Sequence, residues 1–135
     1  MKLSVAFLLC VLSFSSYAES ENSIEKSLDE CLAKRENQTT AGMNTCVGVA
    51  TVAWDKELNV VYGNLMSALD AEGKNNLKKS QIAWLKHRDL EYKFISSVYA
   101  TKVGTMYSNI RAMNVLTLTK NRALELKSYL SSSEL

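Results

Sequence analysis

Six polar or charged side chains occur at positions that should face the interior of a helical bundle. They are Asp55, Asn59, Gln81, Arg88, Thr119 and Arg122. A buried charge without a partner is very costly, so we expect these groups to satisfy one another. Asp55 should pair with one arginine through a bidentate contact. The group is either a structural network or the lining of a ligand site, and a pocket opening beside Arg88 or Arg122 would favour the ligand site.

The remaining reactive side chains do not assemble a catalytic centre. His87 is the only histidine, and its charged neighbours are typical of a solvated helix surface. The acidic pairs Asp29–Glu30 and Asp70–Glu72 lie on diverging directions of a helix or in a turn, whereas a glycosidase needs two carboxyls facing each other. Two thiols and one imidazole are too few for a zinc site. The sequence predicts a non-enzyme with no catalytic, metal-binding or cofactor-binding residue.

Residues 1–18 have the pattern of a cleaved signal peptide. Lys2 gives a short positive start, Leu3–Phe14 is apolar but too short to span a bilayer, and Ala18 ends the segment with a small residue. A lipoprotein anchor at Cys10 is an alternative, but Leu9 stands where a small residue is needed. We expect cleavage after Ala18 and a single domain over residues 19–135.

Cleavage removes one lysine and no acid from 16 basic and 14 acidic residues, which leaves a net charge of +1. This balance lacks the clustered basic footprint of a nucleic-acid-binding protein. No other long apolar stretch follows, so we expect no transmembrane helix in the mature form and a periplasmic or secreted location. The oligomeric state does not follow from the sequence.

Two cysteines, Cys31 and Cys46, survive the expected processing. An even pair in an exported domain is typical of a disulfide, because the compartment is oxidising. Both fall on apolar faces of predicted helices, so a bridge would clamp the first two helices as a hairpin.

The elements that must position these residues are helices. Trp54, Leu58, Val61 and Leu65 recur at helical spacing and form one apolar stripe, with Tyr62 on its flank. This stripe predicts a helix from about Thr40 or Ala41 to about residue 69. No stretch alternates apolar and polar residues as a strand would.

Three further helices are expected. The first is capped by Asn22 or Ser23, with Glu25 completing a capping box, and fades near Arg35. The third runs from Asn75 or Asn76 to Tyr99 and carries Trp84, and the fourth runs from Thr105 to about Tyr129. Turns are expected at 36–42, 70–76 and 102–105, and a frayed tail at 131–135. The fold class is all-α, an elongated antiparallel bundle of about four helices with one disulfide.

The combined motifs resemble the small exported domain family named for the LprI-type lysozyme inhibitor. The residues that carry this resemblance are Cys31, Leu32, Met43, Cys46, Trp54, Asp55, Leu58, Asn59, Tyr62, Gln81, Trp84, Arg88, Asp89, Leu118, Thr119, Arg122 and Leu126. The family usually has a second cysteine pair, for which this chain has Tyr92 and Asn114. We predict that these two side chains contact each other.

The resemblance implies an exported, non-enzymatic envelope protein that binds another protein, with a lysozyme-type wall-degrading enzyme as the candidate partner. The turns at 36–42 and 100–105 are the expected contact regions. The alternative is a periplasmic binder of a small molecule or envelope component that uses the inward polar groups.

Overall fold

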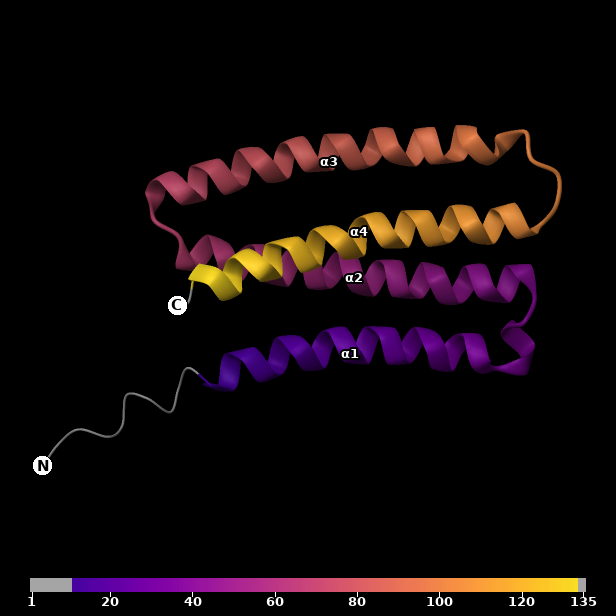
Figure 1. Cartoon of the computed structure of the whole chain (residues 1–135), viewed down its shortest axis with the longest axis horizontal. Coiled ribbons are helices and arrows are strands. Elements are labelled where there is room, and N and C mark those ends of the chain that lie inside the picture. Colours follow the sequence, from indigo (N-terminus) through magenta and orange to yellow (C-terminus); the bar gives the residue numbers. More distant parts are fainter. Residues whose placement is uncertain (1–10, 134–135) are drawn as a thin grey trace, which may run out of the picture.

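The computed structural model describes residues 11–133, which form an elongated antiparallel bundle (Figure 1). The helices are α1 (Val11–Ala33), α2 (Thr40–Ala68), α3 (Ala71–Ala100) and α4 (Met106–Ser133), with a short 3-10 turn η1 (Arg35–Asn37) after α1. The described residues contain no strand. The predicted all-α architecture of four antiparallel helices is confirmed. None of the helices in this part of the chain has the length and apolar character that crossing a bilayer requires.

The core lies mainly between α2 and α4, which pack along most of their lengths. The predicted stripe on α2 is buried, with Trp54, Leu58, Val61 and Leu65 each no more than 3% exposed. Leu116, Ala123, Leu126 and Leu130 of α4 supply the facing side chains. α1 covers another side of α2, whereas α3 packs mostly on α4 and meets α2 at few positions.

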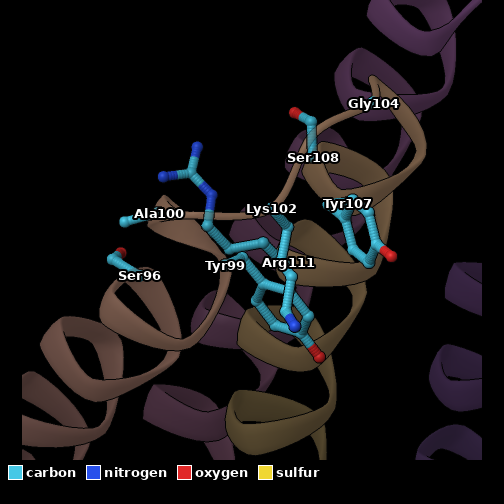
Figure 2. A pocket seen from close by; sticks show the side chains of 8 residues that line it. All are labelled: Ser96, Tyr99, Ala100, Lys102, Gly104, Tyr107, Ser108 and Arg111. Atoms are coloured by element: carbon cyan, nitrogen blue, oxygen red, sulfur yellow. The ribbon is translucent and has the colours of Figure 1, made fainter.

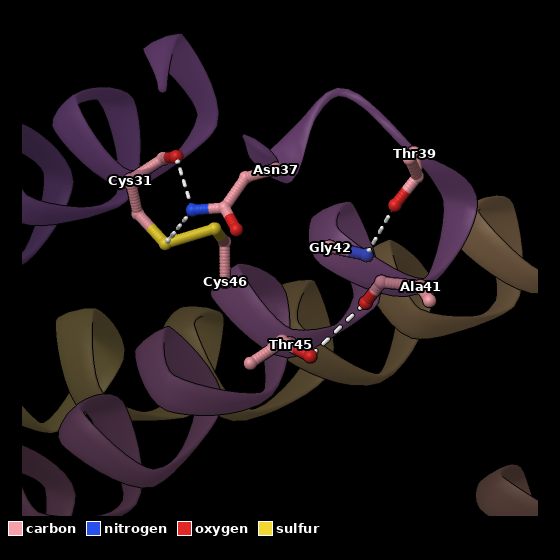
Figure 3. Close-up of a disulfide and its surroundings, with 7 residues drawn as sticks. All are labelled: Cys31, Asn37, Thr39, Ala41, Gly42, Thr45 and Cys46. Atoms are coloured by element: carbon pink, nitrogen blue, oxygen red, sulfur yellow. Dashed lines mark hydrogen bonds between the residues drawn. A yellow bond between two sulfur atoms is a disulfide. The ribbon is translucent and has the colours of Figure 1, made fainter. Parts of the chain in front are cut away.

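A disulfide joins α1 to the start of α2, as predicted. The sulfurs of Cys31 and Cys46 are 2.01 Å apart, and their Cα atoms are 5.7 Å apart (Figure 3). Asn37 donates from its amide to the Cys31 carbonyl oxygen at 2.9 Å and to the Cys31 sulfur at 3.5 Å. The bridge joins residues that are 15 apart in the sequence, and closing a loop of that length stabilises a fold by roughly 3 kcal/mol in the chain-entropy model.

The α1–α2 turn requires a glycine at position 42. A Cβ atom added there would lie 2.5 Å from the Asn37 Cα, which is too close for any side chain. The Gly42 N–H also donates to the Thr39 hydroxyl at 3.0 Å, which caps α2 (Figure 3). The helix begins at Thr40, as the sequence predicted.

The predicted turn at 70–76 is wrong, because α3 begins at Ala71 rather than at Asn75 or Asn76. The Asp70 carboxylate accepts a hydrogen bond from the Gly73 N–H at 2.8 Å and caps the helix. Glu72 lies in the first turn, where the helix dipole favours a negative charge. Acidic residues followed by glycine therefore start a helix here.

The predicted start of the first helix is also wrong. The first described residue, Val11, is already helical, and α1 continues through Asn22 and Ser23 because no proline or glycine interrupts this stretch. Glu25 forms no capping box and instead contacts α2 and α4, as described below. Residues 1–10 of the predicted signal peptide lie outside the described residues, and cleavage after Ala18 remains a prediction.

The last helix is longer than predicted, since α4 extends past Tyr129 to Ser133. The serines near its end follow the helical pattern: the Ser131 and Ser132 hydroxyls donate to carbonyl oxygens four residues earlier. The predicted frayed tail is therefore wrong for residues 131–133. The predicted break after α3 is confirmed, and Gly104 adopts a positive φ of 115° there.

Candidate functional site

The six polar residues predicted to lie inward form two clusters rather than one network. In the first cluster, the Arg88 Nη1 atom lies 3.5 Å from the Asp55 Oδ1 atom. Arg88 also donates from Nε and Nη2 to Asp89 Oδ1 at 3.3 and 3.2 Å. The predicted bidentate contact of Asp55 with an arginine is therefore wrong, because the neighbouring Asp89 takes two of the guanidinium donors.

Asn59 supports the same carboxylate from one turn along α2. Its amide donates to the Asp55 carbonyl oxygen at 2.8 Å and reaches the Asp55 Oδ2 atom at 3.4 Å. Asn59 is exposed and the Asp55 side chain is 49% exposed, so this cluster is open to solvent on the α2 side.

The second cluster surrounds Arg122, whose side chain is only 7% exposed. Its Nε atom donates to Gln81 Oε1 at 3.1 Å, its Nη2 atom to the Ser80 hydroxyl at 3.1 Å, and its Nη1 atom to Glu125 Oε2 at 2.6 Å. Each nitrogen of the guanidinium therefore has a partner. This closed, paired arrangement joins α3 to α4 and is what a structural network requires.

Trp84 of α3 connects the two clusters. The guanidinium carbon of Arg88 lies 5.5 Å from the centre of the Trp84 ring, and that of Arg122 lies 5.8 Å from it. Both distances are within the range of cation–π attraction. Arg88 also lies 5.7 Å from the Tyr92 ring centre, and the Tyr92 hydroxyl is 3.1 Å from the buried Thr119 hydroxyl.

The indole N–H of Trp54 has its partner in a third cluster, which the sequence did not predict. Its indole N–H donates to Glu25 Oε1 at 3.1 Å, and the other Glu25 oxygen lies 2.9 Å from the Lys120 ammonium. Lys120 also lies 5.4 Å from the centre of the Trp54 ring. These residues come from α1, α2 and α4, so the cluster holds three helices together.

Two hollows lie along the groove where α3 faces α2, and the second of them is also bounded by α4. One, of about 260 Å³, is lined by Asp55, Leu58, Asn59 and Tyr62 of α2 and by Lys78, Gln81, Ile82 and Leu85 of α3. The other, of about 370 Å³, is lined by Asn44, Val47, Gly48, Thr51, Tyr92, Ser96, Ser108, Arg111, Ala112 and Val115. Arg88 lies on α3 between the residues that line the two hollows, so its contact with Asp55 crosses the groove between them.

A third hollow, of about 220 Å³, lies at the end of the bundle where α3 turns into α4 (Figure 2). Its lining residues are Ser96, Tyr99, Ala100, Lys102, Gly104, Tyr107, Ser108 and Arg111. Two of them are cations and none is acidic. The Tyr99 and Tyr107 rings lie 6.2 Å apart, centre to centre, and pack the two helix ends against each other.

Glu125 is shared between the Arg122 cluster and Tyr129. The Tyr129 hydroxyl donates to Glu125 Oε1 at 3.1 Å. This hydrogen bond and the negative charge of Glu125 raise the pKa of Tyr129 above its ordinary value of 10.0, while the charge of Arg122 lowers it.

Within residues 11–133, no three His, Cys, Asp or Glu side chains converge on a possible metal position. His87 is exposed on α3. The predicted contact between Tyr92 and Asn114 gains no support, because Tyr92 bonds to Thr119 while the Asn114 amide donates to the Tyr99 hydroxyl at 3.1 Å.

The sequence matches a known protein family. A family model described as "Lysozyme inhibitor LprI" matches residues 31–126. No curated protein matches the chain. The crystal structure of an uncharacterized protein from Burkholderia thailandensis matches with a TM-score of 0.79 at 30% sequence identity, covering 83% of this chain and 55% of that one.

The chain thus spans about half the length of the solved structure that it matches. The matched family segment contains the disulfide, both arginine clusters and most of the four-helix core. This match extends over more than half of the sequence, and the chain belongs to the LprI lysozyme inhibitor family.

Proposed function

We propose that this protein is exported, is not an enzyme, and binds and inhibits a lysozyme-type wall-degrading enzyme. The observation that carries the proposal is the family match over residues 31–126, a family described by lysozyme inhibition. The Cys31–Cys46 disulfide supports export, because such bridges persist in oxidising compartments. The signal-peptide pattern at residues 1–18 supports the same location.

The contact region in this proposal is the end of the bundle that carries the α1–α2 and α3–α4 turns (Figure 1). Beside these turns, the starts of α2 and α4 are joined: the Asn44 amide donates to the Ser108 hydroxyl at 2.7 Å, and the Asn109 amide donates to the Met43 sulfur at 3.0 Å. The helix ends that follow the two turns are therefore held together, which limits the conformational entropy lost on binding.

The test uses the full chain, expressed for export, with its mature start determined by mass spectrometry. The purified protein is added in micromolar excess to a panel of lysozymes acting on a peptidoglycan suspension, and the loss of turbidity is followed. We expect at least one enzyme to be slowed tenfold or more. Full activity of every enzyme would remove the inhibitor proposal.

A second candidate function is binding of a small envelope component in the groove between α2 and α3. The two hollows of about 260 and 370 Å³ on either side of the Arg88–Asp55 contact favour it. Arg88 is 22% exposed and could exchange its contact with Asp55 for an anionic ligand.

Peptidoglycan fragments are the probe for this second function, with binding followed by calorimetry. Arg88→Ala should abolish binding while the circular dichroism of the fold is kept, and Lys86→Ala, an exposed change on the same helix, should leave binding intact. Unfolding of the Arg88→Ala variant would instead assign Arg88 to the structure.

A further inference from the structure

The α3–α4 turn, residues 101–105, is exposed at every position. Val103 at its centre is 94% exposed, more than any other large hydrophobic residue among those described. The opposite end of the bundle is different, because only Leu69 and Asp70 separate α2 from α3. Leu69 packs against the core and Asp70 caps α3, so that connection has no projecting apolar side chain.

Backbone hydrogen bonds restrain both ends of the α3–α4 turn. The Lys102 N–H donates to the Tyr99 carbonyl oxygen at 3.2 Å, and the Tyr107 N–H donates to the Gly104 carbonyl oxygen at 3.3 Å. The positive φ of Gly104 closes the turn. The rings of Tyr99 and Tyr107 pack the end of α3 against the start of α4, so the two ends of the turn are held close together.

The hollow beside this turn has a positive lining although the whole chain is almost neutral. Lys102 and Arg111 line the hollow at the turn, and no carboxylate lines it (Figure 2). Exposed Lys34 and Arg35 lie in the neighbouring α1–α2 turn at the same end of the bundle, with the exposed acids Glu30 and Glu36 beside them (Figure 1).

Glycosidases of the lysozyme type cleave with a pair of Asp or Glu side chains that face each other in a cleft. An exposed turn with a basic side chain and an apolar tip complements such a cleft in charge and in apolar character. We infer that the α3–α4 turn enters the catalytic cleft of the inhibited enzyme, where the Lys102 ammonium pairs with a catalytic carboxylate and Val103 fills the adjoining sugar-binding subsite. This inference rests on the proposed inhibition and specifies its mechanism.

The inference predicts competitive inhibition, because turn and polysaccharide would occupy the same cleft. Lys102→Glu and Val103→Asp should each raise the inhibition constant tenfold or more while the melting temperature stays unchanged. The matched control is Lys79→Glu, the same charge change at an exposed position on α3 near the other end of the bundle, and it should change the constant less than twofold.

A double-mutant cycle tests whether Lys102 pairs with a catalytic carboxylate of the enzyme. Replacing the enzyme's ionised catalytic carboxylate, the one that does not act as the general acid, by its amide should weaken binding of the wild-type inhibitor about tenfold and should not weaken binding of the Lys102→Ala variant further. Inhibition that is noncompetitive, or that survives both Lys102→Glu and Val103→Asp, would overturn this inference and leave the inhibitor function standing. A wild-type protein that inhibits no lysozyme in the panel would remove both.

Discussion

Arg122 and Arg88 both place a guanidinium near the ring of Trp84, at 5.8 and 5.5 Å, but their surroundings differ. Arg122 is 7% exposed and each of its nitrogens has a side-chain partner. Arg88 is 22% exposed, and its contact with the half-exposed Asp55 is long. The two arginines that the sequence predicted to share one network therefore have different surroundings: Arg122 is buried and fully paired, whereas Arg88 is partly solvated and faces the groove.

The strongest test of this comparison is Arg122→Met. The change leaves buried Gln81 without its charged donor and separates Glu125 from its cation, so we expect a loss of about 3 kcal/mol in the free energy of unfolding. Urea denaturation followed by circular dichroism measures it. The matched control Arg111→Met, an exposed arginine on the same helix, should change stability by less than about 0.5 kcal/mol.

Trp84→Leu should have an intermediate effect of about 2 kcal/mol. The variant loses two cation–π contacts, each worth about 0.5–1 kcal/mol, and part of the apolar surface that the ring covers. When Arg88 is already methionine, Trp84→Leu should reduce the free energy of unfolding by about 0.5 kcal/mol less, because one cation–π contact is already absent. Strict additivity of the two changes would mean that Arg88 and the ring are not coupled.

Arg88→Met alone should cost only about 0.5–1 kcal/mol, as expected for a partly solvated ion pair together with ring contacts. The same urea titration checks this value. If Arg88→Met destabilised the fold as much as Arg122→Met, the distinction between the two arginines would be wrong.

The smallest expected effect is on the titration of Tyr129. Its pKa is raised above 10.0, first by the hydrogen bond to Glu125 and then by the charge of Glu125. The stabilisation linked to this proton is present below about pH 10 and is lost as the pH rises through the folded-state pKa. Glu125→Gln should lower the pKa, and Arg122→Met should raise it further, because the arginine charge opposes the shift.

Phenolate absorbance measures this pKa, with the signal of Tyr129 taken from the difference between each variant and the same variant carrying Tyr129→Phe. A Tyr129 pKa that does not move in Glu125→Gln would show that the carboxylate does not control it.

The sequence predicted those features that depend on spacing within one helix. The stripe of Trp54, Leu58, Val61 and Leu65 is buried, and Cys31 is bonded to Cys46. Features that depend on the register between helices were not predictable. Glu25 and Lys120 meet at Trp54 from α1 and α4, and no spacing within either helix indicates that meeting.

The wrong helix starts have a local cause. Aspartate and glycine are common both in turns and at helix caps, so the residue types at positions 70 and 73 do not tell a turn from a helix start. The structure shows a helix start, because the Leu69 backbone is extended and the Gly73 N–H donates to the Asp70 carboxylate. The six polar residues divide into two clusters because each arginine also bonds to an acid on its own helix. Arg88 donates to the adjacent Asp89, and Arg122 donates to Glu125 one turn away.

The close approach at Gly42 also links the α1–α2 turn to the surroundings of the disulfide. A side chain at position 42 would displace Asn37, whose amide donates to the carbonyl oxygen and the sulfur of Cys31. A substitution at position 42 would therefore break hydrogen bonds at Cys31, although residue 42 itself does not touch the cystine.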